Sequence, residues 1–179
     1  MKVLVTGGAG FIGSHVVDRL VEEGHQAVVV DNMATGSRRN VNRAANLYKT
    51  DIQGWRLERI FRNERPNVVL HLAAQVNVRR SVEDPVFDAQ VNVLGTMNVL
   101  QQAVRHGVRK VVFSSSGGAI YGEQEQGPAP ESHATNPMSP YGISKLCGEH
   151  YLFYFQRLSG IQVVSLRHAN VYGPRQDPD

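Results

Sequence analysis

Short runs of β-branched and other apolar residues recur along the chain, and longer stretches with helically spaced apolar positions separate them. Such runs predict buried strands, because a strand covered on both faces is apolar along its whole length. They lie at residues 2–6, 27–31, 68–71, 110–114 and 162–166, with a shorter candidate at 46–50. Strands that alternate with helices in this way indicate an α/β fold, a doubly wound parallel sheet in a three-layer arrangement.

Two longer segments have helical periodicity. Residues 84–106 predict a single helix, and Gly107 follows it as a C-terminal cap. Residues 139–158 predict a second helix. Between them, residues 122–140 are rich in proline and lack a helical period, so we expect a surface loop of the kind that often closes over a site.

Composition and charge exclude several classes of function. The formal net charge of the 179 residues is +3, but the basic residues are interleaved with acids, and we expect no nucleic-acid partner. A single cysteine, Cys147, excludes an internal disulfide and a CxxC metal site, so we expect no metal and a cytoplasmic location. No signal peptide or run of membrane-spanning length is present in the sequence, and we expect no membrane partner.

A glycine-rich turn follows the first predicted strand directly. Residues 6–13 read TGGAGFIG and contain the spacing GxGxxG between Gly8 and Gly13. Glycine permits a tight turn and the close approach of backbone to a pyrophosphate, and the following helix N-terminus presents free amides to the anion. The alternative is a purely structural turn. The position between strand and helix favours a dinucleotide site in a Rossmann domain.

The second predicted strand ends at Asp31, where an acidic side chain meets the adenosine ribose in such domains. A carboxylate there accepts both ribose hydroxyls and repels a 2′-phosphate, which favours NAD over NADP. Arg38 and Arg39 nearby leave NADP as the minority interpretation. Asp31 also suits a simple turn-forming role before Asn32, and the two roles are compatible.

Tyr141 and Lys145 are four residues apart at the start of the second predicted helix and therefore share one face of it. A tyrosine with a pKa of about 10 needs a drop of roughly 3 units, or about 4 kcal/mol, to act as a base near neutrality. A cation at about 4 Å supplies about 4 kcal/mol at an effective dielectric constant of about 20. We therefore expect Lys145 to lower the pKa of Tyr141.

Three serines, residues 114–116, follow the apolar run of the fifth predicted strand. Ligands of doubly wound sheets collect at the carboxyl ends of the strands, and a hydroxyl there can hydrogen-bond a reacting oxygen. Each feature alone has a structural explanation. Their order along the chain, which is the order that one fold requires, favours a catalytic site.

These motifs identify the chain as similar to the extended short-chain dehydrogenases/reductases, in the NAD-dependent epimerase/dehydratase family. It most resembles the UDP-glucose 4-epimerases. The resemblance is carried along the whole chain by VTGGAGFIGSH, Asp31-Asn32, Asp51-Ile52, HLAA from His71, VNVLGT around Asn92, FSSSGGAIYG, SPYGISK and ANVYGPRQ.

The resemblance implies roles for individual residues. Ser116, Tyr141 and Lys145 are the expected catalytic residues, and Ser116, Tyr141 and Asn170 are expected to contact the substrate. The expected NAD-binding residues are Gly7, Gly10, Phe11, Ile12, Gly13, Asp31, Asn32, Gly36, Asp51, Ile52, Leu72, Ala73, Ala74, Val76, Asn92, Ser114, Tyr141, Lys145 and Ala169. His168 is expected to be a core histidine, with a contact on the nicotinamide side as the alternative.

The implied activity is 4-epimerisation of a nucleotide sugar of the UDP-glucose/UDP-galactose type, with bound NAD and a homodimeric assembly. Gly117 and Gly118 stand where related dehydratases carry an Asp-Glu pair, which favours the epimerase. The alternatives are another enzyme of the family and a non-catalytic NAD-binding protein. Residues 1–179 are expected to form one NAD-binding Rossmann domain that stops before the substrate-binding domain, with low activity or none by itself.

Overall fold

Six parallel strands form one sheet at the centre of the molecule, in the order β3-β2-β1-β4-β5-β6. The computed structural model describes residues 1–123 and 128–177, so residues 124–127 of the expected loop at 122–140 lie outside the described residues. The strands are β1 (Lys2–Thr6), β2 (Gln26–Asp31), β3 (Asn46–Lys49), β4 (Val68–His71), β5 (Lys110–Ser116) and β6 (Gln162–His168). The predicted doubly wound parallel sheet is confirmed. Strands β5 and β6 each extend two residues beyond their predicted ends.

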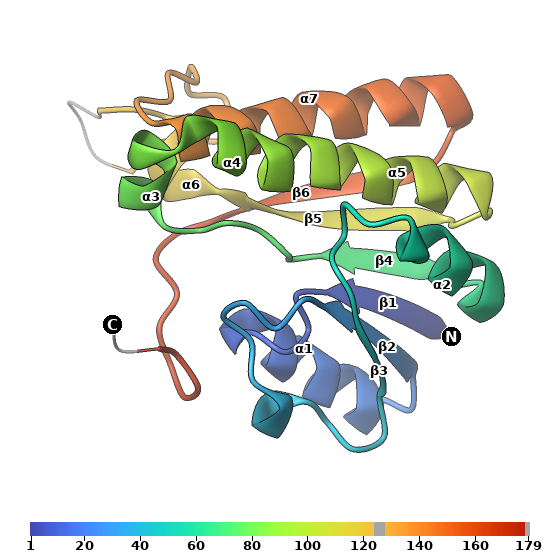
Figure 1. The fold of residues 1–179 in the computed structure, drawn as a ribbon. Coiled ribbons are helices and arrows are strands. Elements are labelled where there is room, and N and C mark those ends of the chain that lie inside the picture. Colours follow the sequence, from blue (N-terminus) through green and yellow to red (C-terminus); the bar gives the residue numbers. More distant parts are fainter. Residues whose placement is uncertain (124–127, 178–179) are drawn as a thin grey trace.

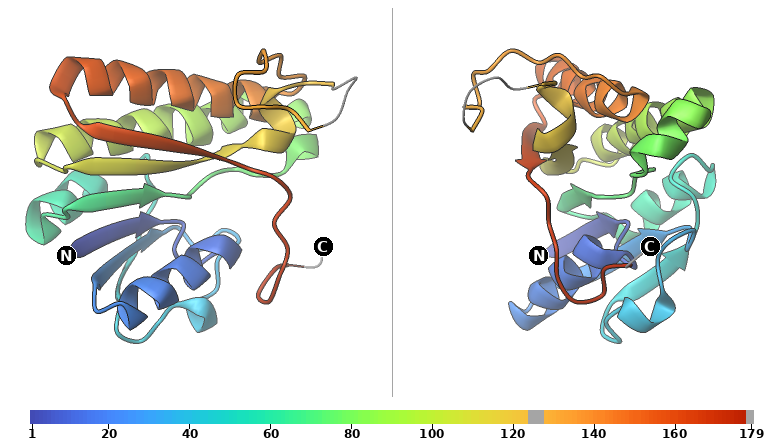
Figure 2. Two further views of the ribbon diagram at one scale, coloured as in Figure 1. Left: turned by 180° about the vertical axis from the view of Figure 1, so that it is seen from behind. Right: turned by 90° about the vertical axis from the view of Figure 1, so that its left-hand side faces the viewer.

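Helices cover both faces of the sheet (Figures 1 and 2). On one face α1 (Phe11–Glu22) packs through Val17 against Val3 and Val5. On the other face lie α2 (Arg56–Glu64), α5 (Gly95–Arg105) and α7 (Pro140–Ser159), around a larger core that includes Leu4 and Phe113. Successive residues of β1 enter opposite cores, as the period of two of a strand requires. None of the described helices is both long and apolar enough to cross a membrane.

The segment at residues 84–106 is not the single regular helix that the periodicity predicts. It contains α4 (Pro85–Ala89), a π-helical segment η2 (Gln90–Leu94) and then α5, preceded by the short helix α3 (Val78–Glu83). A π-helical turn holds an extra residue, which apolar spacing over a long window does not reveal. The predicted cap is confirmed, because Gly107 follows α5 with a φ of +71° and its amide donates to the Val104 carbonyl. The remaining short helices are η1 (Arg38–Asn40) and α6 (Gly117–Ile120).

After β6 the chain runs back across the carboxyl end of the sheet to α1 (Figures 1 and 2). Three contacts hold this returning segment, residues 169–177. The Pro174 carbonyl lies 2.9 Å from His15 Nε2, Arg175 forms a 2.7 Å ion pair with Asp18, and Gly173 lies beside the Phe11 ring. The segment therefore spans from β6 to the glycine turn.

Replacing Gly13 by Ala is expected to destabilise the domain. A Cβ at Gly13 would overlap the Gly7 carbonyl oxygen, so helix and turn have to separate. We expect a loss of at least about 2 kcal/mol in the free energy of unfolding, measured by urea denaturation. Gly118→Ala is the matched control, because its Cβ would lie no closer than 3.9 Å to Asn170, and its stability should stay within about 1 kcal/mol of wild type. Equal stabilities for the two variants would contradict this packing.

Candidate functional site

The glycine turn between β1 and α1 comes very close to the loop after β4. Gly7 has a φ of +71°, and a Cβ there would lie 2.7 Å from the Ala73 amide nitrogen, so glycine is needed for the backbone of the turn to reach the loop after β4. A Cβ at Gly10 would have only the Gly7 carbonyl oxygen nearby, at 3.3 Å. Helix α1 begins at Phe11 and has no side-chain cap, so the amides of its first turn are available to an anion.

Asp31 lies at the carboxyl end of β2 beside this turn. Its Oδ2 accepts a 2.9 Å hydrogen bond from the Ala9 amide and its Oδ1 accepts one of 2.8 Å from the Met33 amide. A Cβ at Gly36 would lie 2.9 Å from Oδ1, so that glycine lets the next loop approach the carboxylate. Asp31 therefore holds the turn in place, and each oxygen keeps a second lone pair for a ribose hydroxyl.

Asp51 and Ile52, two of the expected NAD-binding residues, lie on a neighbouring loop. Asn32 Nδ2 donates to Asp51 Oδ2 at 2.9 Å, which links the ribose side to this loop. The Ile52 side chain is buried against Gly95, and the Ile52 carbonyl accepts from Asn98 Nδ2 at 2.6 Å. Since its side chain belongs to the core, Ile52 has only its backbone left to offer a ligand.

Tyr141, Lys145 and Ser116 come together at the carboxyl end of β5. Pro140 opens α7 after the Ser139 N-cap, so Tyr141 and Lys145 lie in the first two turns on one side of the helix. Tyr141 lies close enough to Ser116 for the serine hydroxyl to lower the pKa of the phenol, and Lys145 Nζ lies 5.8 Å from the centre of the Tyr141 ring. Lys145 Nζ also donates to the Ser114 carbonyl at 2.8 Å. The structure thus brings the three expected catalytic residues into one group.

The expected effect of Lys145 on Tyr141 is not what this structure shows. Burial raises the pKa of Tyr141, the Ser116 hydroxyl lowers it, and the charge of Asp88 raises it again, with a net shift upward. Burial also lowers the pKa of Lys145 to about 8. The expectation from the sequence assumed that the Lys145 ammonium carries a full charge at about 4 Å from the phenol oxygen. It left out the free-energy cost of burying the charged phenolate. Lys145 alone therefore does not make Tyr141 a base at neutral pH.

Asn92 contacts the loop after β4. Its Oδ1 accepts from the Gln75 amide and its Nδ2 donates to the Gln75 carbonyl, both at 2.9 Å, and Nδ2 also reaches Asp88 at 3.0 Å. All of these partners are protein atoms. Asn92 therefore fixes the loop that carries the expected cofactor residues Leu72, Ala73, Ala74 and Val76.

A row of hydrogen bonds runs through the fully buried His71 at the end of β4. Thr6 Oγ1 accepts from the amides of Leu72 and Ala73, each at 3.2 Å, so its own proton goes to His71 Nδ1 at 2.7 Å. His71 Nε2 then donates to Thr96 Oγ1 at 2.9 Å, and that hydroxyl donates to the Asn92 carbonyl. Burial, with the charge of Lys145, lowers the pKa of His71 to about 3. His71 is therefore a neutral, structural residue.

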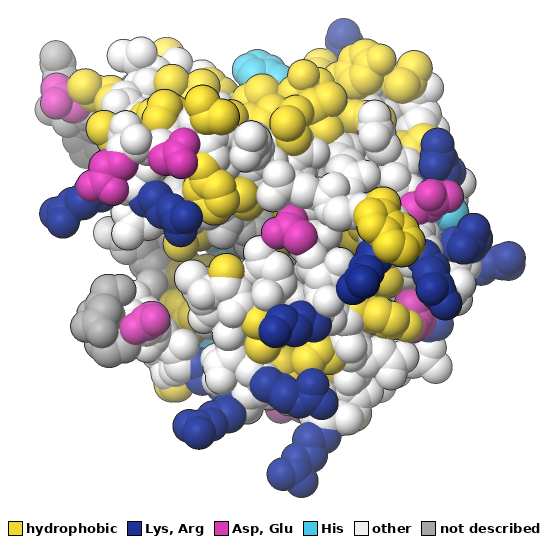
Figure 3. Space-filling view, in the orientation of Figure 1, with side chains coloured by type: hydrophobic (Ala, Val, Ile, Leu, Met, Phe, Trp, Pro, Cys, Tyr) yellow, Lys and Arg dark blue, Asp and Glu magenta, His cyan; other side chains and the backbone are white. Residues whose placement is uncertain are grey.

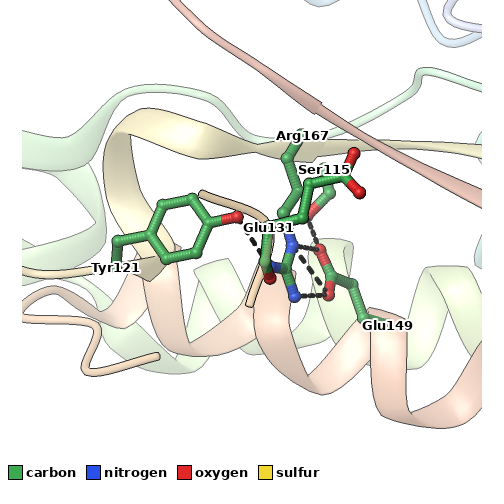
Figure 4. A network of polar contacts seen from close by, with 5 residues as sticks. All are labelled: Ser115, Tyr121, Glu131, Glu149 and Arg167. Atoms are coloured by element: carbon green, nitrogen blue, oxygen red, sulfur yellow. Dashed lines mark hydrogen bonds and ion pairs between the residues drawn. The ribbon is translucent and has the colours of Figure 1, made fainter. Parts of the chain in front are cut away.

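A second polar network connects α7 to the end of the sheet (Figure 4). Glu149 accepts from Ser115 Oγ at 2.5 Å and from Arg167 Nη2 at 2.7 Å, and Arg167 Nη1 donates to the Tyr121 hydroxyl at 2.7 Å. An open cavity of about 860 Å³ lies along this edge of β6, between α6 and the start of the returning segment. Its lining includes Gly117, Gly118, His168, Ala169 and Asn170, but not Tyr141.

The structure therefore groups most, but not all, of the expected site residues. Val76 is exposed, and Ala169 and Asn170 are exposed on the returning segment beside the cavity. His168 is half-buried and lines the cavity, so it is not the core histidine that we expected. Sequence reasoning missed Asp88, although it stands one helical turn before Asn92, where a carboxylate among inward-facing positions is itself a signal.

Comparison with known proteins gives the family. Residues 3–179 match the model of the NAD dependent epimerase/dehydratase family. The chain belongs to this family. Among its relatives, a putative UDP-glucose 4-epimerase from Methanocaldococcus jannaschii is 49% identical over 176 residues, which is 98% of this chain and 58% of the relative.

Two solved structures of the family are also similar. A Thermus thermophilus UDP-glucose 4-epimerase in complex with NAD superposes with a TM-score of 0.98 at 51% identity, over 100% of this chain and 58% of that one. A Thermotoga maritima UDP-glucose 4-epimerase with UDP-glucose gives a TM-score of 0.97 at 51% identity, over 99% of this chain and 58% of that one. The chain thus spans somewhat more than half the length of these relatives.

His71 should make the domain sensitive to acid. Its pKa is about 3 when folded and 6.5 when unfolded, so below pH 6.5 the unfolded state takes up a proton that the folded state does not. Stability should therefore fall as the pH decreases through this window. We expect His71 to account for about 2 kcal/mol of lost unfolding free energy between about pH 7 and about pH 5.

The measurement is urea denaturation at several pH values. A His71→Gln variant, although less stable overall, should lack this part of the pH dependence. His150→Gln, on the exposed side of α7, removes no buried ring and should keep the wild-type loss. If the unfolding free energy of wild type and of His71→Gln decreased equally with falling pH, the lowered pKa of His71 would be contradicted.

Proposed function

We propose that this chain is the NAD-binding region of a nucleotide-sugar 4-epimerase of the UDP-glucose/UDP-galactose type. The observation that carries the proposal is the group formed by Tyr141, Ser116 and Lys145, next to a glycine turn shaped for a pyrophosphate. The names of the similar proteins support the substrate class. A non-catalytic NAD-binding role has no need for such a group.

NAD, when bound, supplies a reversible hydride acceptor and a positive charge beside Tyr141. Tyr141, as the phenolate, would take the proton of the sugar 4-hydroxyl while carbon 4 is oxidised to a ketone. Ser116 hydrogen-bonds the same oxygen and stabilises the negative charge that develops on it. In the reverse half of the reaction, when the ketone is reduced again on its other face, Tyr141 would give the proton back to that oxygen.

The two glycines after Ser116 support an epimerase over a dehydratase. Elimination of water across two sugar carbons needs an added acid and base near the reacting carbons. Gly117 and Gly118, which follow Ser116 directly in the chain, offer no ionisable side chain there. Epimerisation, which transfers one proton and one hydride at carbon 4, requires only Tyr141, Ser116 and NAD.

Replacing Tyr141 by Phe in the full-length protein is expected to reduce epimerase turnover at least about 100-fold, because the proton acceptor is lost. NAD binding, measured by calorimetry, should stay within a few-fold of wild type. Tyr151→Phe, on the same helix, is the matched control and should retain turnover. The substrates are a panel of UDP, GDP and dTDP sugars, with and without N-acetyl groups. Turnover by Tyr141→Phe at the wild-type rate, or wild-type activity on none of the UDP sugars, would overturn the proposal.

We also propose that the protein is a homodimer that associates through its outer helices. Helices α3, α4 and η2 pack alongside α7, and Figure 3 shows hydrophobic side chains gathered over α7 at the top of the molecule. Their exposed apolar residues are Val78, Val82, Val86, Leu94, Ile143, Phe153, Tyr154 and Leu158. Exposed apolar residues gathered on neighbouring helices are typical of an association interface.

A charge placed within this surface should weaken the dimer. We expect Val86→Glu and Tyr154→Glu each to raise the dimer dissociation constant at least about 100-fold, because the carboxylate is desolvated without a partner. Sedimentation velocity of the full-length protein measures the change. Trp55→Glu, at an exposed aromatic residue that precedes α2, is the matched control. A wild-type protein that stays monomeric at tens of micromolar would overturn the proposal.

A further inference from the structure

Asp88 on α4 is a fully buried carboxylate to which the reaction scheme assigns no role. Its Oδ1 accepts from Gln75 Nε2 at 2.9 Å and from Asn92 Nδ2 at 3.0 Å, and its Oδ2 accepts from Ser144 Oγ at 2.5 Å. The three donors belong to the loop after β4, to η2 and to α7. One side chain thus connects the three segments that surround the candidate site.

The donor on α7 stands directly before Lys145. Lys145 is 3% exposed, and its Nζ lies over the Phe113 ring at 4.9 Å while it donates to the Ser114 carbonyl. Burial lowers the pKa of Lys145, and the negative charge of Asp88 acts in the opposite direction.

The other titratable groups around Lys145 do not supply a negative charge. They are His71 on β4 and His168 on β6, whose pKa values are lowered by burial and by Lys145 itself, and Tyr141 on α7, whose pKa is raised. All three are therefore neutral at pH 7. Among the described residues Asp88 is the carboxylate whose charge bears on this ammonium.

We propose that Asp88 is a positioning residue of the site, whose buried carboxylate holds α7 against the loop after β4 and is the negative charge that balances Lys145. This role goes beyond the proposed function. Of the two experiments that test it, only the measurement of turnover depends on the proposed function.

A carboxylate suits this position better than an amide. All three partners of Asp88 donate, and an ionised carboxylate accepts at both oxygens, whereas an asparagine amide at the same position would set one donor against another. Asp88→Asn therefore removes the charge and one acceptor with little change in volume. Ser144→Ala is the matched control, because it removes one hydrogen bond and leaves the charge in place.

The first experiment measures the ionisation of Lys145 directly, without cofactor or substrate. Full-length protein labelled with ¹³C at the lysine ε carbons is titrated by NMR, and the Lys145 signal is assigned by its absence from a Lys145→Arg variant. Wild type should titrate at about 8. Asp88→Asn should titrate about one unit lower, and Ser144→Ala should stay close to wild type.

Coincident titrations of wild type and Asp88→Asn would overturn the proposal. If Asp88→Asn does not fold, the wild-type titration decides. An ammonium that persists to about pH 8 supports a balancing charge, and a lysine already neutral at about pH 6 excludes it. None of these outcomes depends on the protein being an epimerase.

The second experiment follows turnover against pH in the full-length protein. If protonated Lys145 is the active form, the ratio of Asp88→Asn to wild-type turnover should fall as the pH rises from about 6.5 to about 8.5. The corresponding ratio for Ser144→Ala should stay constant, since its charge is unchanged. If the ratio of Asp88→Asn to wild-type turnover stayed constant with pH, Asp88 would have a merely structural role and its charge would not act on Lys145. Absence of turnover in wild type would contradict the proposed function and leave the NMR result standing.

Discussion

The contact between two stretches of backbone, at Gly7 and Ala73, is the constraint on which the site depends. The two backbone segments approach so closely that no side chain fits at Gly7. The Thr6 hydroxyl also accepts hydrogen bonds from the amides of both Leu72 and Ala73. The turn after β1 and the loop after β4 are therefore one rigid unit. In the proposed function, a dinucleotide bound at the first would therefore lie beside the second.

Polar groups buried behind this unit hold the catalytic side in register with it. The row through His71 reaches from Thr6 to the Asn92 carbonyl, and the Asn92 side chain returns to Gln75 on the loop after β4. Buried polar groups are costly unless all of them are paired. In this network the buried polar groups are paired with one another and link β1, β4 and η2. The same hydrogen bonds therefore contribute to the stability of the domain and determine the geometry of the site.

The sequence was sufficient to predict the sheet, because apolar runs and their alternation with helices determine a parallel α/β fold. It was also sufficient to expect the serines at 114–116 near Tyr141 and Lys145, from their positions at a strand end and on a helix, whereas the choice of Ser116 among the serines came from the family resemblance. It could not predict the π-helical segment, because the extra residue leaves the apolar spacing nearly unchanged. Nor could it predict the direction of the pKa shift of Tyr141, which depends on burial and on Asp88, far away in the sequence.

The returning segment after β6 has a mechanical consequence. The ion pair between Arg175 and Asp18 and the contact of Pro174 with His15 attach it to α1, at the opposite side of the sheet from β6. A force applied to the chain beyond these contacts is transmitted first to α1 and to the Phe11 ring, before it reaches the strand that precedes the segment. The start of α1, which lies at the glycine turn, is therefore directly coupled to the segment that follows β6.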